Sequence, residues 1–166
     1  MNTHQSTATT RGVAGNKVAI ITGGSRGLGR NTAVSLARRG VDVIVTYHAK
    51  QQDAETVVRE IETMGRKAAA FQLNTGDTPA FDGFASDVRN TLQKWGRERF
   101  DFLVNNAGHS LHVPFVDVTE VQFDEMVNVG FKGVYFLTKK LLPLMNDGGR
   151  KGWRGSPWAT APPMGP

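Results

Sequence analysis

The sequence predicts an α/β fold in which helices flank a doubly wound parallel sheet, and two observations support this prediction. Short apolar runs alternate with amphipathic helical segments over residues 17–149. This alternation is typical of right-handed βαβ units. The first apolar run also leads directly into a glycine-rich turn and a helix, an order found in nucleotide-binding folds. The chain has 166 residues, which is enough for one domain with a buried core.

Apolar periodicity, with glycines and prolines at the ends, predicts the position of each element. Strands are expected at residues 18–21, 41–47, 67–73 and 100–105. Helices are expected at 28–39, at 51–64, from Pro79 to near Gly96, and at 121–142. Leu28 is expected to face the core. The apolar residues of the last helix cover more than one of its faces, so we expect this helix to be buried on two sides, against the sheet and against a partner.

Both ends of the chain differ in composition from the region between them. Residues 1–16 are rich in Thr, Ser, Gln and Gly and are expected to form a disordered leader. Residues 150–166 contain four of the seven prolines and no Val, Ile, Leu or Phe, so they are expected to form an irregular Gly/Pro-rich tail. The sheet is therefore predicted to be incomplete after the long helix, with the strand at 100–105 as an exposed edge.

Composition and charge exclude several classes of protein. The chain has no cysteine, so it has no disulfide, and no metal site is expected. No apolar run is long enough to span a membrane, and residues 1–17 lack the apolar core of a signal peptide, so we expect a soluble, cytoplasmic protein. The net charge is +5, but the basic residues are scattered, and nucleic-acid binding is not expected.

The turn after the first strand has the features of a phosphate-binding site. Gly23, Gly27 and Gly29 allow positive φ angles, close approach of the backbone to a pyrophosphate, and tight packing of the helix on the strand. The N-terminus of the helix adds unpaired N–H groups and the positive end of its dipole. We therefore predict a dinucleotide site at this turn.

Three segments resemble signatures of the short-chain dehydrogenases/reductases, a family of nicotinamide-dependent oxidoreductases. They are Thr22-Gly23-x-x-x-Gly27-x-Gly29, Asn105-Asn106-Ala107-Gly108 after the fourth predicted strand, and residues 124–130 in the longest helix. The resemblance covers residues 17–150, and Ser25-Arg26-Gly27 is similar to the ketoreductase-like members that use NADPH. It implies a Rossmann-like fold, hydride transfer between the cofactor and a carbonyl or alcohol, and a homo-oligomer formed through the helix at 121–142.

The glycine turn and the resemblance together define the expected site. By resemblance, Asn128 holds a water in a proton relay; the alternative is a solvent-facing asparagine. Asn74 stands where the family commonly has an aspartate that receives the adenine amino group, and the alternative is a turn residue that closes residues 74–77. The expected cofactor contacts are Gly23, Ser25, Arg26, Gly27, Leu28, Gly29, Tyr47, Asn74, Asn105, Ala107 and Gly108.

The residues near the end of the second strand favour NADP(H) over NAD(H). A site for NAD usually has an acidic residue there to hold the ribose 2′-hydroxyl, but residues 46–50 read Thr-Tyr-His-Ala-Lys. Asp42 lies at the start of the strand, at the wrong edge of the sheet. Arg26 and Lys50, with His48, are instead suited to pair with a 2′-phosphate. The alternative is that Arg26 and Lys50 are solvated surface charges.

The residues that would complete the family's chemistry are missing. The resemblance implies a fifth strand, a catalytic serine and then a Tyr-x-x-x-Lys pair, in which the lysine lowers the pKa of the tyrosine toward the operating pH. Ser156 falls near the serine's distance from Asn128, between Gly155 and Pro157, and is interpreted as a coincidence. Tyr135 and Lys139 match the spacing of the pair, but they follow Asn128 on the same helix, so a chance match is favoured.

Three interpretations of function follow. The first is an NADP(H)-dependent short-chain oxidoreductase that is truncated or frame-altered and catalytically incomplete. The second is a non-catalytic NADP(H)-binding or regulatory module whose long helix binds a partner. The third is an unstable fragment without activity. The substrate is not predicted, because the family's substrate loop would lie beyond the last residue.

Overall fold

The computed structural model describes residues 16–108 and 111–153, and it contains one parallel sheet of five strands. The expected leader and residues 154–166 of the expected tail lie outside the described residues, apart from Asn16. The strand order is β3-β2-β1-β4-β5, and every neighbouring pair is parallel. The strands are β1 (Val18–Ile21), β2 (Asp42–Tyr47), β3 (Ala68–Gln72), β4 (Phe100–Asn105) and β5 (Met145–Trp153). The predicted α/β class with a doubly wound parallel sheet is confirmed.

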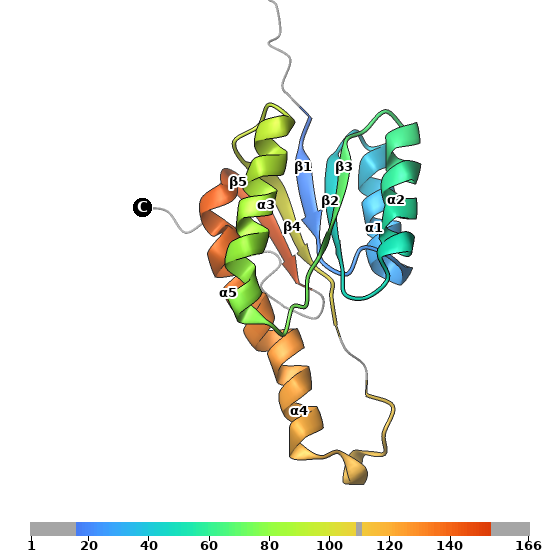
Figure 1. Cartoon of the computed structure of the whole chain (residues 1–166), viewed down its shortest axis with the longest axis vertical. Coiled ribbons are helices and arrows are strands. Elements are labelled where there is room, and N and C mark those ends of the chain that lie inside the picture. The colour runs from blue at the N-terminus through green and yellow to red at the C-terminus, as the bar shows by residue number, and fades with distance from the viewer. Residues whose placement is uncertain (1–15, 109–110, 154–166) are drawn as a thin grey trace, which may run out of the picture.

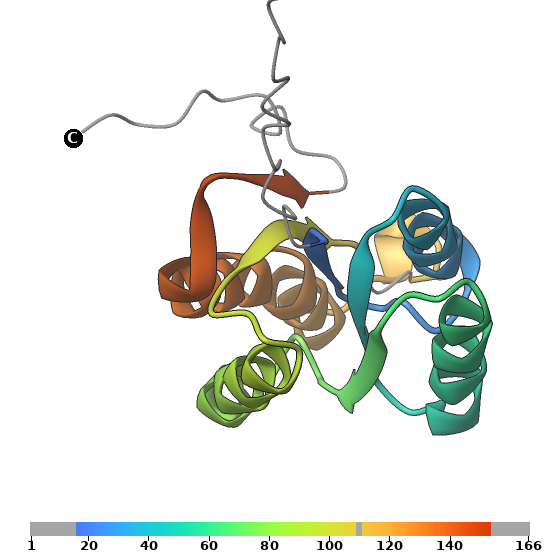
Figure 2. The ribbon, with the colours of Figure 1, turned by 90° about the horizontal axis from the view of Figure 1, so that it is seen from above.

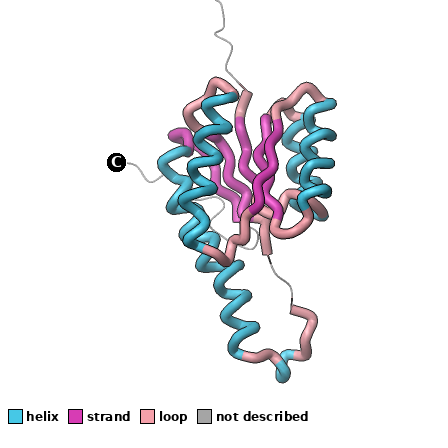
Figure 3. Tube along the Cα trace, in the orientation of Figure 1, coloured by secondary structure: helices cyan, strands magenta, loops and turns pink. Residues whose placement is uncertain are grey.

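Helices cover both faces of this sheet (Figures 1 and 3). Helices α1 (Gly27–Arg38) and α2 (Gln51–Thr63) lie on one face, and α3 (Phe81–Lys94) and α5 (Gly133–Leu141) lie on the other, as the view from above shows (Figure 2). Helix α4 (Glu120–Val127) extends beyond the carboxyl ends of the strands (Figure 1). Short helical turns occupy Thr78–Ala80, Phe115–Asp117, Asn128–Lys132 and Leu142–Leu144.

The core consists of two apolar layers, one on each side of the sheet. Strands β1 and β2 contribute to both layers because alternate side chains of a strand point to opposite faces. The layer under α3 and α5 includes Ile20, Ile44, Phe84, Leu92, Leu103 and Leu137. The layer under α1 and α2 includes Ile21, Ala33, Val43, Val45, Val57 and Ile61. Burial on both faces explains why β1 and β2 are apolar without alternation.

Two aspartates join the strands at their amino ends. Asp42 is 5% exposed, and its Oδ1 accepts a hydrogen bond of 2.9 Å from the Lys67 N–H, which links the starts of β2 and β3. Asp101 Oδ2 accepts 2.8 Å from the Val18 N–H, and its Oδ1 accepts 3.0 Å from Asn146 Nδ2. Asp42 therefore lies at the edge of the sheet opposite to the glycine turn, as the sequence predicted.

The strand β5 corrects the expectation that the sheet ends at β4. Residues 150–153, expected to begin an irregular tail, continue this strand, which pairs with β4 through an irregular register. A side chain on Gly149 would place its Cβ 2.9 Å from the Asp101 carbonyl oxygen, so glycine permits the close approach. The strand forms because the N–H and C=O groups along the open edge of β4 provide hydrogen-bond partners. Such pairing does not require an apolar pattern in the sequence of β5.

The helix expected at 121–142 is interrupted and exposed. A π-helical turn at Asn128–Lys132 separates α4 from α5. Within the single chain this segment is buried on one side only, through Leu137 and Leu141, and its burial against a partner stays a prediction. Its exposed apolar side chains are Val121, Phe123, Val127, Phe131, Tyr135, Phe136 and Leu142.

Leu28 is a further correction, because it does not face the core. It is 57% exposed, whereas Ala33, Val34 and Ala37 form the buried side of α1. Leu28 lies in the first turn of the helix, and α1 begins at the end of the sheet where the strands have their carboxyl termini. The exposed Leu28 side chain is therefore accessible to a ligand at that edge.

Candidate functional site

The candidate site lies at the carboxyl ends of β1 and β4, where the strand order reverses. The chain passes from β1 outward to β2 and β3, and then returns to place β4 on the other side of β1. In doubly wound sheets, ligands bind in the crevice at this switch point. The glycine turn follows β1, and residues 105–108 follow β4, so the fold brings the two predicted motifs side by side.

The glycine turn has the backbone geometry that its sequence predicts. Gly23 and Gly27 have φ angles of +64° and +56°, in the left-handed region that favours glycine. A Cβ on Gly29 would lie 2.2 Å from the Gly23 carbonyl oxygen and 2.5 Å from Asn106 Nδ2. Gly29 therefore lets the first turn of α1 pack against the glycine turn, which directs the helix N-terminus at the space above β1.

Thr22 connects the two motifs, and sequence reasoning missed this role. Its side chain is 1% exposed, and its Oγ1 accepts hydrogen bonds of 3.0 Å from both the Asn106 N–H and the Ala107 N–H. In return, Asn106 Nδ2 donates 3.0 Å bonds to the carbonyl oxygens of Thr22 and Gly23. The sequence signal for this contact was a threonine directly before the glycine turn, together with two consecutive asparagines after the fourth predicted strand.

A second threonine fixes the turn to the neighbouring strand. The Gly23 N–H donates 3.2 Å to Thr46 Oγ1, and the Gly24 N–H donates 2.8 Å to the Thr46 carbonyl oxygen. Thr46 is 1% exposed and lies near the end of β2. The turn is thus held by both neighbours of β1, so its N–H groups are positioned before any ligand arrives.

The basic residues predicted to recognise a 2′-phosphate lie at the same edge. Arg26 is the residue before α1 and Lys50 is the residue before α2, and both are exposed. Because β1 and β2 are paired neighbours, these two loops are adjacent. His48 is also exposed, while Ser25 and Tyr47 are half-buried. None of these residues is acidic.

Asn74 forms the turn that the sequence offered as its alternative role. Its Oδ1 accepts a hydrogen bond of 2.9 Å from the Gly76 N–H. The residue is exposed, and the amide oxygen retains a second lone pair. The turn interpretation is therefore confirmed, and contact with adenine through the remaining lone pair stays a prediction.

Asn105 lies beneath the site. It is 4% exposed, and its Nδ2 donates 3.2 Å to Thr138 Oγ1 on α5. Its Oδ1 has no hydrogen-bond partner among the described residues. Ala107 is half-buried and Gly108 is exposed, so these two residues, rather than Asn105, form the accessible part of the predicted contact.

Asn128 begins the π-helical turn at the junction of α4 and α5. It is half-buried, and its carbonyl oxygen accepts a hydrogen bond from the Gly133 N–H. Its role in a proton relay stays a prediction. Tyr135 is seven residues further along the chain, a rise of about 10 Å. Its side chain is 61% exposed and packs edge-to-face on Phe136 at 5.3 Å.

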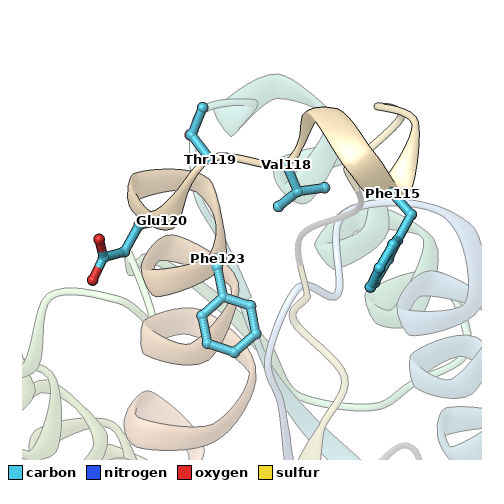
Figure 4. A pocket seen from close by; sticks show the side chains of 5 residues that line it. All are labelled: Phe115, Val118, Thr119, Glu120 and Phe123. Carbon is cyan, nitrogen blue, oxygen red and sulfur yellow. The ribbon is translucent and has the colours of Figure 1, made fainter.

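Two open hollows lie away from the glycine turn. One, of about 340 Å³, is formed by the segment before α4 and the start of that helix. Figure 4 shows Phe115, Val118 and Phe123 turned toward this hollow, while Glu120 points away. The other, of about 510 Å³, lies between α3 and α5 and includes Phe81, Phe136 and Lys139. The glycine turn lines neither of these two hollows.

Within residues 16–108 and 111–153, no group of three or more His, Cys, Asp or Glu side chains is placed to hold a metal ion. In the same part of the chain, no helix combines the length and the apolar character needed to cross a bilayer.

Comparisons with known proteins agree with this geometry. The profile of the short chain dehydrogenase family matches residues 17–153. A hydroxynaphthalene reductase-like protein, Arp2, of Metarhizium majus is 33% identical over 142 residues, which are 86% of this chain and 51% of that protein. The chain thus spans about half the length of the curated relatives it matches.

Two solved structures of similar proteins are complexes with a nicotinamide cofactor. A short chain dehydrogenase from Burkholderia cenocepacia in complex with NADP is 35% identical, with a TM-score of 0.76, covering 89% of this chain and 58% of that one. A carveol dehydrogenase from Mycobacterium avium in complex with NAD is 25% identical, with a TM-score of 0.68, covering 79% of this chain and 50% of that one. The profile match, the parallel five-stranded sheet and the paired motifs at its switch point establish that this chain belongs to the short-chain dehydrogenase/reductase family of oxidoreductases.

Proposed function

We propose that this chain binds NADP(H) at the switch point between β1 and β4, as the cofactor-binding part of an oxidoreductase that acts on a carbonyl or alcohol. The observation that carries the proposal is the set of paired motifs, in which Thr22 joins the positive-φ glycine turn to residues 106 and 107. When bound, the cofactor supplies or accepts a hydride. The chain's own residues bind and orient it.

The expected contacts follow from the positions of the residues. The N–H groups at the start of α1 face the pyrophosphate, and Gly29 keeps that approach open. Ser25 and Leu28 lie in the same turn, and Ala107 and Gly108 border the site from β4. Asn128 holds a water for proton relay at the junction of the two helices, as the resemblance implies.

The preference for NADP(H) is proposed from the charges at the ends of β1 and β2. Arg26 and Lys50 are exposed before adjacent helices, and residues 46–50 contain no acid that would hold a free 2′-hydroxyl. A guanidinium forms short, charge-assisted hydrogen bonds to a phosphate. Such a bond is worth about 1.5–3 kcal/mol, so Arg26 alone is expected to favour NADPH over NADH by about tenfold or more.

A binding titration tests both parts of the proposal. NADPH and NADH are titrated into the 166-residue chain, with cofactor fluorescence as the signal. We expect the parent chain to bind NADPH more tightly than NADH, and Arg26→Ala to lose about tenfold of that preference. Arg38→Ala is the control, because its side chain is exposed at the other end of α1, and it should keep the parent preference. Gly29→Ala is expected to weaken both cofactors. Tighter binding of NADH would contradict the preference, and binding of neither would contradict the site.

A second function, cofactor binding without turnover, is favoured by the position of Tyr135. This residue and Lys139 make the only Tyr-x-x-x-Lys spacing in the sequence, yet Tyr135 lies about 10 Å along the helix from Asn128 and is exposed. We therefore expect this chain to bind NADPH without oxidising it in the presence of a panel of ketones and aldehydes. Oxidation that Tyr135→Phe abolishes would contradict this expectation.

Self-association through the helical segment 121–142 is proposed on the basis of its exposed apolar side chains. Val121 is 77% exposed and Phe123 is 55% exposed, whereas charged residues normally cover such a helix face. Sedimentation of the chain should give a dimer or larger species, and Phe123→Glu should shift it toward the monomer. A monomer at all concentrations would refute this proposal.

A further inference from the structure

Helix α5 and the turn after β3 approach each other closely at Gly133. A Cβ built on Gly133 would lie 1.8 Å from the Thr75 carbonyl oxygen and 2.9 Å from the Thr75 carbonyl carbon. Real Cβ atoms do not come within 3.0 Å of backbone atoms. Gly133 is buried and helical, so its function here is to leave room rather than to adopt a positive φ.

The helical segment before Gly133 contacts the same turn. A Cβ on Gly76 would lie 3.2 Å from Val129 Cγ2 and 3.3 Å from Asn74 Oδ1. The Gly133 N–H donates to the Asn128 carbonyl oxygen, which closes the π-helical turn just before this contact. The turn at residues 74–76 therefore packs along residues 129–133, with Thr75 7% exposed between them.

The same helix is held at a second point by the neighbouring strand. Asn105, at the end of β4, donates its Nδ2 to Thr138 Oγ1 at 3.2 Å, and Thr138 is five residues after Gly133. This bond and the buried side chains of Leu137 and Leu141 hold α5 against the sheet and oppose movement of the helix away from Thr75. An added methyl group at position 133 must then displace the 74–76 turn.

We propose that Gly133 is a positioning residue that sets the place of the Asn74–Gly76 turn and, through it, the recognition of the adenine ring. The inference rests on the proposed binding of NADP(H) and on the predicted contact between Asn74 and the adenine amino group. Asn74 is held by its own turn, since its Oδ1 accepts from the Gly76 N–H. A displacement of the turn therefore also displaces Asn74 Oδ1, whose remaining lone pair is the proposed acceptor for the adenine amino group.

The test compares NADPH with its hypoxanthine analogue, in which a carbonyl oxygen replaces the adenine amino group. One neutral hydrogen bond corresponds to about a 3- to 10-fold preference for NADPH in the parent chain. We expect Asn74→Ala and Gly133→Ala both to reduce this preference to about one. Gly130→Ala is the matched control, because it lies in the same π-helical turn and a Cβ there meets no atom within 4 Å. It should keep the parent preference.

The ratio of the two affinities separates positioning from general destabilisation, because a less stable but folded protein keeps its preference. If Gly133→Ala does not yield folded protein, Val129→Ala replaces it, and its preference should fall by at least half. A parent preference that Asn74→Ala removes and Gly133→Ala retains would overturn the inference, as would a parent that binds both nucleotides equally. A parent that binds neither nucleotide would instead overturn the proposed function.

Discussion

The hydroxyl of Thr22 is predicted to be worth about 2 kcal/mol to the stability of the fold, and Thr22→Val tests this. Valine keeps the shape of the buried side chain but cannot accept the two N–H groups from residues 106 and 107. The two bonds are not equivalent. The Asn106 N–H also reaches the Val104 carbonyl oxygen at 3.1 Å, whereas the Ala107 N–H has no other acceptor described.

The magnitude follows from this difference. Leaving a buried N–H without a partner costs about 1–3 kcal/mol, which applies to Ala107, while Asn106 loses only one of two acceptors. A total of about 2 kcal/mol corresponds to a decrease of roughly 4–8 °C in Tm for a domain of this size. Because residues 106 and 107 also border the cofactor site, the same variant should bind NADPH more weakly.

Urea denaturation monitored by circular dichroism measures the change. The matched control is Thr56→Val, which removes an exposed helical hydroxyl that donates to the Gln52 carbonyl oxygen at 2.9 Å and should change stability by less than about 0.5 kcal/mol. If Thr22→Val unfolds at the same urea concentration as the control, the bonds between the two motifs do not stabilise the fold, and the reasoning is refuted.

Two further predictions concern the sheet and a helix surface. Asp101→Ala removes the acceptor for the Val18 N–H and for Asn146 Nδ2, so it should destabilise the chain by about 1–3 kcal/mol. The control is Asp87→Ala, at an exposed position, and an equal urea midpoint for the two variants would contradict the prediction. Gly83→Ala should stabilise the chain by about 0.5–1 kcal/mol, because Gly83 is exposed in α3 and a Cβ there meets no atom within 4 Å. A decrease in Tm would show that the space around position 83 is less open than described.

The sequence by itself determined the order and type of most elements and the positions of the glycines in the turn after β1. The strand at 100–105 was predicted with its observed bounds, and the other predicted strands differ by at most a residue at each end. Such elements are readable because their apolar periodicity and terminal glycines are local properties of the chain. Gly23 and Gly27 were likewise identified from a local requirement, the positive φ of a tight turn.

The tertiary structure decided what depends on residues far apart in the chain. β5 was missed because its few apolar residues give no strand pattern, and it forms through pairing with the open edge of β4. Leu28 was placed inward because helical periodicity does not show that the first turn of α1 extends past the sheet. The same holds for Thr22, Asn105 and Gly133, whose roles are contacts with residues 106–107, Thr138 and Thr75. Close packing and buried hydrogen bonds are properties of pairs, so no single stretch of sequence contains them.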